Sequence, residues 1–192
     1  MADEGVLCDS ARTMGRRGFL QLGLGAAAAA TILSPDESHA IMKAPPRQLS
    51  FVNLHTGEKV RAAYWAQGRY LREGMREINR LMRDHRNGAV HPMDPRLLDV
   101  LFHLQRRVGT RGPIQIVSAY RSPQTNAMLH ESDPDGVATH SYHMDGKAVD
   151  IRIPGLPLRS LHRAALSLRA GGVGYYPASN FVHVDVGPLR RW

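Results

Sequence analysis

The sequence has a single cysteine, Cys8, among its 192 residues. A disulfide needs two thiols, so the chain cannot form one within itself, although disulfides are common in exported proteins. Cys8 also precedes the paired arginines Arg16 and Arg17, which is not the position of a lipid-attachment cysteine. The fold must therefore be held by a hydrophobic core, supported at most by a bound metal.

The sequence also lacks an apolar run long enough to cross a membrane, which takes about 20 residues. Its most apolar stretch, residues 19–33, is shorter than this and is interrupted by glycines. Two arginines precede the stretch and the small-residue segment Ser38-His39-Ala40 follows it. This order of charged, apolar and small residues is typical of an export signal, and the arginine pair resembles the twin-arginine motif.

We therefore expect residues 1–40 to be a signal peptide of the twin-arginine type that is cleaved after Ala40. Residues 41–50 contain two adjacent prolines and are expected to form a linker. Residues 51–192 are expected to form one domain, located in the periplasm and without a stable membrane span after cleavage. An uncleaved amino-terminal anchor helix is the alternative, and Met14 is an alternative start of the chain.

Acidic residues are scarce after residue 40. The chain has 25 Lys and Arg and 17 Asp and Glu, and residues 1–40 hold three of the former and five of the latter. Residues 41–192 therefore carry a formal charge of +10, which attracts polyanions. In an exported protein, we expect the partner to be the cell wall with its peptide carboxylates. Nucleic-acid binding would rest on charge alone, and export argues against it.

Hydrophobic periodicity predicts an α+β domain in which strands and helices are mixed rather than regularly alternating. Residues 49–65 alternate around a Thr-Gly-Glu turn and predict a hairpin. Helices are predicted at 70–86, 93–109, 122–132 and 157–170, and further strands at 113–120, 147–153 and 181–186. The glycines of 171–174 are interpreted as a helix stop and a turn before Tyr175 and Tyr176, which either line a groove or pack in the core.

Two of these strands carry residues suited to chemistry. Side chains of a strand alternate between faces, so His183 and Asp185 lie on one face of 181–186 and the valines lie on the other. In 147–153, Asp150 lies opposite Val149 and Ile151. If both strands belong to one sheet, Asp150 and His183 face a common groove, and the loop that holds His143 leads into it.

Two imidazoles and one carboxylate around an open position suit a catalytic zinc ion. Such an ion lowers the pKa of a bound water and polarises a substrate carbonyl. The spacing of these residues alone supports a metal site and a set of structural histidines equally well. The remaining histidines after residue 40, apart from His140, are expected to be surface or capping residues.

Longer motifs connect this chain to a known family. "SYHMDGKAVDI", "SAYRSPQTN" and "GGVGYYPASNFVHVDVG" resemble, in this order, the motifs of the LAS-type zinc metallopeptidases, which include D-alanyl-D-alanine carboxypeptidases and the hedgehog domain. "LSFVNLHTGE", "RDHR" and "RRW" resemble its bacterial murein endopeptidase K branch. The resemblance covers nearly all of residues 47–192. It implies a small antiparallel sheet with helices packed on one side, and one Zn²⁺ per chain held by His143, Asp150 and His183.

The resemblance also implies roles for other positions. Arg121 occupies the position of an arginine that binds a substrate carboxylate or carbonyl, and Ser118 and Tyr120 lie in the same segment. A structural arginine paired with a buried carboxylate is the alternative. Many family members place a glutamate as general base where this chain has Asn180. Asp185 and His140 are the candidates for that role, although Asp185 is equally suited to orienting His183 and His140 to an exposed loop.

The function implied is that of a zinc-dependent peptidoglycan hydrolase, an endopeptidase that cleaves amide bonds in murein stem-peptide crosslinks. The enzyme is expected to act as a monomer on peptidoglycan peptides. A D,D- or L,D-carboxypeptidase on stem peptides is the first alternative, because it uses the same metal chemistry. A non-catalytic, zinc-containing wall-binding module is the second, because hedgehog relatives keep the site in a signalling protein.

Overall fold

The computed structural model describes residues 44–192 of the chain. The predicted signal peptide lies outside the described residues. Strand β1 begins at Arg47, and Leu49 is buried in the core. Residues 47–50, which the sequence analysis assigns to a linker, are therefore part of the sheet. None of the helices within 44–192 has the length and apolar character needed to span a membrane.

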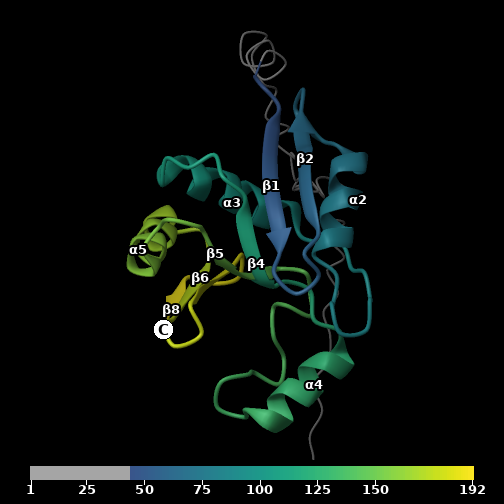
Figure 1. Cartoon of the computed structure of the whole chain (residues 1–192), viewed down its shortest axis with the longest axis vertical. Helices are drawn as coiled ribbons and strands as arrows, with labels where there is room; N and C mark the ends of the chain where they lie inside the picture. The colour runs from purple at the N-terminus through teal and green to yellow at the C-terminus, as the bar shows by residue number, and fades with distance from the viewer. Residues whose placement is uncertain (1–43) are drawn as a thin grey trace, which may run out of the picture. The chain divides into compact units, whose positions relative to one another are not determined.

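The α+β class is confirmed: within residues 44–192, eight strands form one sheet and four helices accompany it (Figure 1). The strands, in their order across the sheet, are β3 (Arg69–Tyr70), β2 (Lys59–Ala66), β1 (Arg47–Asn53), β4 (Ile114–Ser118), β5 (Ala148–Arg152), β7 (Phe181–Asp185), β6 (Gly172–Tyr176) and β8 (Arg190–Arg191). The helices are α2 (Arg72–Leu81), α3 (Pro95–Arg107), α4 (Pro123–Ser132) and α5 (Leu158–Leu168).

The prediction of a small antiparallel sheet is confirmed only in part, because the sheet has eight strands and two of its strand pairs are parallel. Strand β1 runs parallel to β4, and β6 runs parallel to β8. The chain between β1 and β4 holds β2, β3, α2 and α3, which gives it the length that a parallel crossover needs. All other strand pairs are antiparallel.

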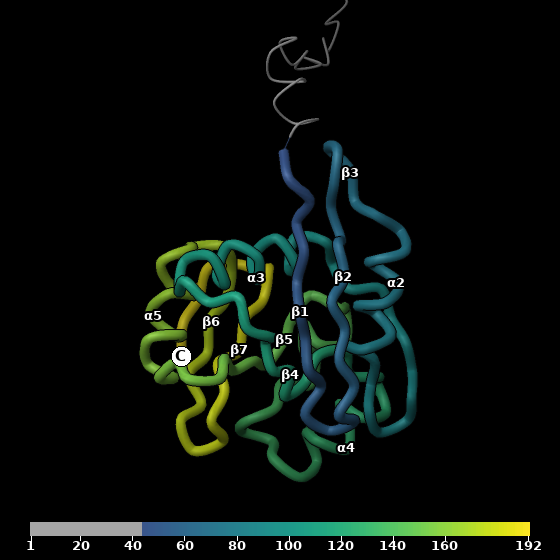
Figure 2. The backbone as a smooth tube through the Cα atoms, turned by 45° about the horizontal axis from the view of Figure 1, so that its top comes forward, coloured from purple at the N-terminus to yellow at the C-terminus, as the bar shows by residue number. Residues whose placement is uncertain are grey.

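Helix boundaries follow local chemistry. Asp94 caps α3 by accepting a hydrogen bond from the Arg96 N–H, and Pro95 occupies the first turn. Ser122 caps α4 in the same way by accepting from the Thr125 N–H. Helix α2 lies beside β2 (Figure 2), where Gly74 lets it approach the backbone carbonyl of Ala63.

The sheet separates a core face from a polar face. Ile151, Val182 and Val184 point into the core, which α3 and α5 complete with leucines such as Leu101 and Leu161. On β5 and β7, the alternate residues point to the opposite face. Those residues include the acidic and histidine side chains of the predicted site, so the same two strands supply both the core and the site.

Strand β6 corrects a second expectation, because it occupies residues interpreted as a turn. A β-carbon added at Gly172 would lie 2.5 Å from the Asp185 carboxylate, and one added at Gly174 would lie 2.7 Å from the Trp192 ring. These glycines therefore allow side chains to cross closely over a strand. Tyr175 packs against the core, whereas Tyr176 lines a groove.

Candidate metal centre

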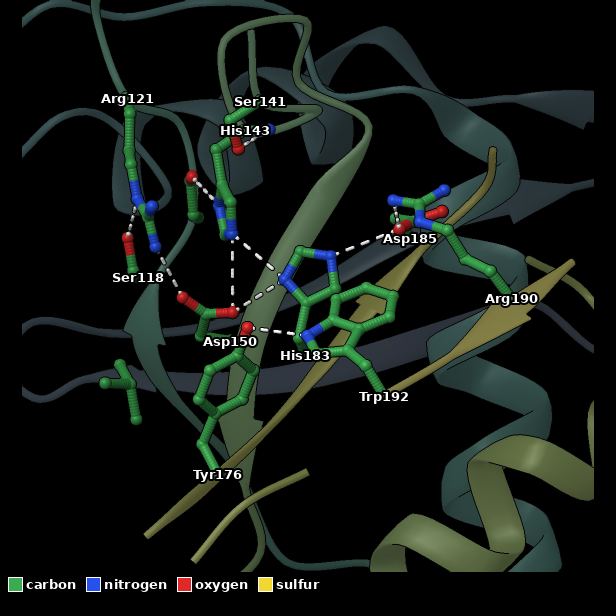
Figure 3. A network of polar contacts seen from close by, with 12 residues as sticks. Ser118, Arg121, Ser141, His143, Asp150, Tyr176, His183, Asp185, Arg190 and Trp192 are labelled. Atoms are coloured by element: carbon green, nitrogen blue, oxygen red, sulfur yellow. Dashed lines mark hydrogen bonds and ion pairs between the residues drawn. The ribbon is translucent and has the colours of Figure 1, made fainter. Parts of the chain in front are cut away.

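His143, Asp150 and His183 come together on the polar face of the sheet (Figure 3). Asp150 and His183 are cross-strand partners on β5 and β7, and His143 lies in the turn that precedes β5. Nδ1 of His183 lies 2.9 Å from Oδ1 of Asp150 and 3.2 Å from Nε2 of His143. The third edge, between Nε2 of His143 and Oδ1 of Asp150, is 3.3 Å.

These three atoms fit the ligand set of a tetrahedral zinc ion. Zinc binds imidazole nitrogen and carboxylate oxygen at about 2.0–2.2 Å, which separates neighbouring ligands in a tetrahedron by roughly 3.3 Å. The observed edges of 2.9, 3.2 and 3.3 Å are close to this separation. Three protein ligands, rather than four, is also the number that a catalytic zinc site would use.

His143 is held with its metal-facing nitrogen free of a proton. Its Nδ1 lies 2.6 Å from the carbonyl oxygen of Ala119, so Nδ1 carries the hydrogen and donates it. Nε2 is then a lone-pair donor. Complete burial lowers the pKa of His143 below its ordinary value, and this outweighs the opposing charge of Asp150. The ring is therefore neutral, as a metal ligand must be.

Asp150 uses its two oxygens for different partners. Oδ1 faces the two imidazoles, and Oδ2 accepts a hydrogen bond of 2.7 Å from the Arg121 guanidinium. Burial would raise the pKa of Asp150, but the neighbouring imidazoles outweigh it, and the pKa lies below its ordinary range. The Nε–H of Arg121 donates to the Ser118 hydroxyl at 3.1 Å. Ser118 and Arg121 therefore fix the carboxylate in its orientation.

Asp185 stands behind His183, where it lies 3.2 Å from Nε2. It also accepts from the N–H groups of Gly172 and Gly187 and from Arg190, the last at 2.6 Å. Burial would raise the pKa of Asp185, but the hydrogen bonds from His183 and from the Gly187 and Gly172 N–H groups hold it below its ordinary value. Both oxygens are thus engaged, which favours an orienting role over that of a general base.

His183 lies between two carboxylates. Burial would lower its pKa, but the hydrogen bonds to Asp150 and Asp185 outweigh burial and raise it. The same negative surroundings that favour a proton also favour a divalent cation in front of Nδ1. The donor set and its charge therefore both suit a metal ion.

The cluster lies at the base of a groove of about 770 Å³. Its walls include the loop 133–142 and four aromatic rings, those of Tyr142, Tyr176, Phe181 and Trp192. The Trp192 ring lies 5.3 Å from that of His183, and its N–H donates to the Tyr176 hydroxyl at 2.7 Å (Figure 3). Sequence reasoning missed Trp192 as a site residue, although "RRW" was the signal that pointed to it.

Of the other predicted residues, the structure places some at the groove and some away from it. His140 lines the groove, and its side chain is 73% exposed. The Tyr120 ring instead stacks on His91 at 4.8 Å and is absent from the groove lining. Asn180 is exposed in the β6–β7 turn with φ of +53°, a conformation that asparagine tolerates well. Its side chain therefore belongs to a turn position rather than to the ligand cluster.

Comparisons with known proteins identify the family of this chain. Residues 41–192 match the family described as Peptidoglycan L,D-endopeptidase MepK. A protein of that name from Escherichia coli is 47% identical over 178 residues, which cover 92% of this chain and 96% of the relative. A Haemophilus influenzae protein named probable peptidoglycan L,D-endopeptidase MepK is 42% identical over 173 residues, 89% of this chain and 92% of the relative. This chain therefore belongs to the peptidoglycan L,D-endopeptidase MepK family of metallopeptidases.

Proposed function

We propose that this chain is a zinc-dependent peptidoglycan endopeptidase that acts in the periplasm and cleaves an L,D amide bond in the crosslinks between stem peptides. The observation that carries the proposal is the triangle of His143 Nε2, Asp150 Oδ1 and His183 Nδ1, with edges of 2.9–3.3 Å, at the base of a groove. The names of the relatives supply the substrate and the bond.

One zinc ion per chain would be held by these three side chains, since all three ligand atoms come from one chain. A monomer is therefore sufficient for the site. When bound, zinc supplies Lewis acidity that polarises an amide carbonyl and lowers the pKa of water. Export by the twin-arginine route stays a prediction from residues 1–40.

The protein groups around the ligands have separate tasks. Arg121 donates two of its five N–H groups to Ser118 and Asp150. Its remaining N–H groups are available to bind a substrate carbonyl or carboxylate at the groove wall. Asp185 keeps the hydrogen of His183 on Nε2, so that Nδ1 faces the cation. His140 lines the groove without belonging to the ligand triangle, and we assign proton transfer to it.

The aromatic walls suit the substrate class. Stem peptides offer short aliphatic side chains and many backbone amides. Tyr176 and Trp192 present flat apolar faces with polar edges, which suits such a ligand. Arg121 and Arg190 in the same lining complement its carboxylates.

The test is chromatography of defined crosslinked muropeptides after incubation with the protein. Wild type should convert L,D-crosslinked dimers to monomers and leave D,D-crosslinked dimers intact. His143→Ala and zinc removal should each abolish the conversion, whereas His103→Ala, at an exposed position on α3, should not. Elemental analysis must show zinc at one equivalent per chain in wild type and its loss in His143→Ala.

Other outcomes would replace the proposal. Release of a terminal amino acid from uncrosslinked peptides, without dimer cleavage, would identify a carboxypeptidase. Zinc at one equivalent with no product from any muropeptide would identify a non-catalytic module. Full dimer cleavage by protein that elemental analysis shows to be metal-free would refute the zinc mechanism itself.

A further inference from the structure

A second groove, of about 890 Å³, lies along α2 and shares none of its lining residues with the metal groove. Four arginines line it: Arg72, Arg76 and Arg80 on α2, and Arg83 just after the helix. We call it the α2 groove.

The arginines form one stripe because residues 72, 76 and 80 are spaced four apart on a helix. Like charges at this spacing destabilise a helix, so helix stability does not account for the stripe. Arg83 is neutralised by Glu58 at 2.7 Å, and Arg76 meets Glu73 at 3.2 Å in an exposed pair. Within residues 44–192, Arg72 and Arg80 have no ion-pair partner, which leaves a surplus of positive charge in the groove.

Apolar surface accompanies this charge. Val90 is 57% exposed and Tyr70 is 41% exposed, and both line the groove together with Met75. A merely solvated arginine stripe does not need a hollow with exposed apolar side chains beside it. A hollow that combines unpaired guanidinium groups with exposed apolar side chains instead suits an anionic ligand that has an aliphatic part.

The α2 groove adjoins the backbone of the metal site. Pro92 lines the groove, and its carbonyl oxygen lies against Gly146, three residues after His143. The Asp94 N–H donates to the carbonyl oxygen of Gly146 at 2.9 Å. One segment, residues 90–94, therefore borders the α2 groove and also packs on the loop that holds His143.

We infer that the α2 groove is a second peptidoglycan site that binds the carboxylates of a stem peptide other than the one being cleaved. The inference rests on the proposed function for the identity of the ligand, since a polymer with repeated carboxylates is then always present beside the metal site. Guanidinium groups match carboxylates in charge and geometry, and the exposed Val90 and Tyr70 contact the aliphatic side chains. Holding the polymer there raises the effective concentration of crosslinks at the metal groove.

The experiment compares two triple variants of the full chain. Arg72→Ala/Arg76→Ala/Arg80→Ala removes the three helix arginines from the α2 groove and leaves only Arg83, which is paired with Glu58. Three exposed arginines on α3 and α5 provide a control with the same loss of charge: Arg107→Ala/Arg159→Ala/Arg163→Ala. Binding to purified sacculi is measured by co-sedimentation on ice with EDTA, so that it is scored without hydrolysis.

The groove variant should bind sacculi roughly tenfold more weakly than wild type, as expected from the loss of several modest charge contacts. The control variant should lose less than about twofold through the change in net charge. Sacculi whose carboxylates have been amidated should bind wild type as weakly as untreated sacculi bind the groove variant. Cleavage of small soluble muropeptides should be equal in all three proteins, because these do not reach both grooves.

Equal binding by the groove variant and wild type, or equal losses in both variants, would overturn the inference. So would a groove variant that loses binding to anionic phosphatidylglycerol vesicles while it keeps its binding to sacculi. A failure of the proposed function looks different, since binding would persist while no muropeptide is cleaved by any of the proteins.

Discussion

The hydrogen bond from His183 to Asp185 makes a sharp prediction for Asp185→Asn. The asparagine oxygen can still accept from the N–H groups of Gly172 and Gly187, as Oδ1 of Asp185 does at 3.0 and 2.8 Å. The new NH₂ group then faces two other donors, Nε2–H of His183 and the Arg190 guanidinium. Two donors cannot satisfy each other, so His183 shifts its hydrogen to Nδ1, the nitrogen that should bind zinc.

The size of the effect follows from the loss of one orienting partner. Such partners contribute about 10- to 100-fold to metal affinity, which corresponds to roughly 1.4–2.7 kcal/mol. The zinc dissociation constant of Asp185→Asn should therefore rise by this factor, as measured by competition with a chromophoric chelator. Glu77→Gln, an exposed residue on α2, removes the same charge and should leave the constant unchanged.

Activity at saturating zinc separates the two roles considered for Asp185. If it orients His183, most muropeptide cleavage returns when zinc is raised above the new dissociation constant. If it is the general base, cleavage stays lost although the zinc site is full. An unchanged zinc affinity in Asp185→Asn would refute the reasoning from the hydrogen-bond geometry.

Two further predictions concern stability. Asp84 is buried and accepts from the N–H and the hydroxyl of Ser122. Burial would raise its pKa, but hydrogen bonding to Thr125 and Ser122 outweighs burial and keeps the pKa below the ordinary value. Its contribution is complete above the unfolded pKa of about 3.9 and is lost as pH falls through the lower folded pKa. Asp84→Asn should thus cost about 1–3 kcal/mol at pH 7 in denaturant unfolding, and the difference from wild type should shrink below about pH 4. An unchanged difference at pH 3 would contradict this. Gly74→Ala should destabilise by about 1–3 kcal/mol, because the new methyl group meets the Ala63 carbonyl oxygen, although alanine favours a helix. Gly112→Ala, whose methyl group finds only ordinary contact, is the control, and equal melting temperatures for the two variants would refute the packing argument.

Local patterns in the sequence were sufficient for much of the fold. Alternation in 147–153 and 181–186 predicted that Asp150 and His183 share a face, and these residues are cross-strand partners. The Asp94–Pro95 start of α3 was visible because capping depends only on neighbouring residues. These features are decided within a few residues of the chain, which is the range that a sequence pattern covers.

Features that depend on contacts between distant segments could not be predicted from local sequence patterns. The parallel pairing of β1 with β4 depends on segments about 60 residues apart. Gly172 and Gly174 suggested a turn, because the side chains that cross them, from Asp185 and Trp192, come from other strands or from the end of the chain. The sequence assigned no separate role to Arg190, yet its guanidinium donates to Asp185 at 2.6 Å. Each of these misses is a tertiary contact that overrides a local preference.

The three side chains that face one another across β5, β7 and the preceding turn have a mechanical consequence. A cation bound by all three would hold these segments together and stabilise them locally. The β1–β2 hairpin holds none of the three ligands, so its local stability should not change. Hydrogen–deuterium exchange should then slow on zinc addition in residues 143–150 and 181–185, and stay unchanged in 47–66. The ion would then act as a local crosslink in a chain that has only one cysteine and can form no disulfide within itself.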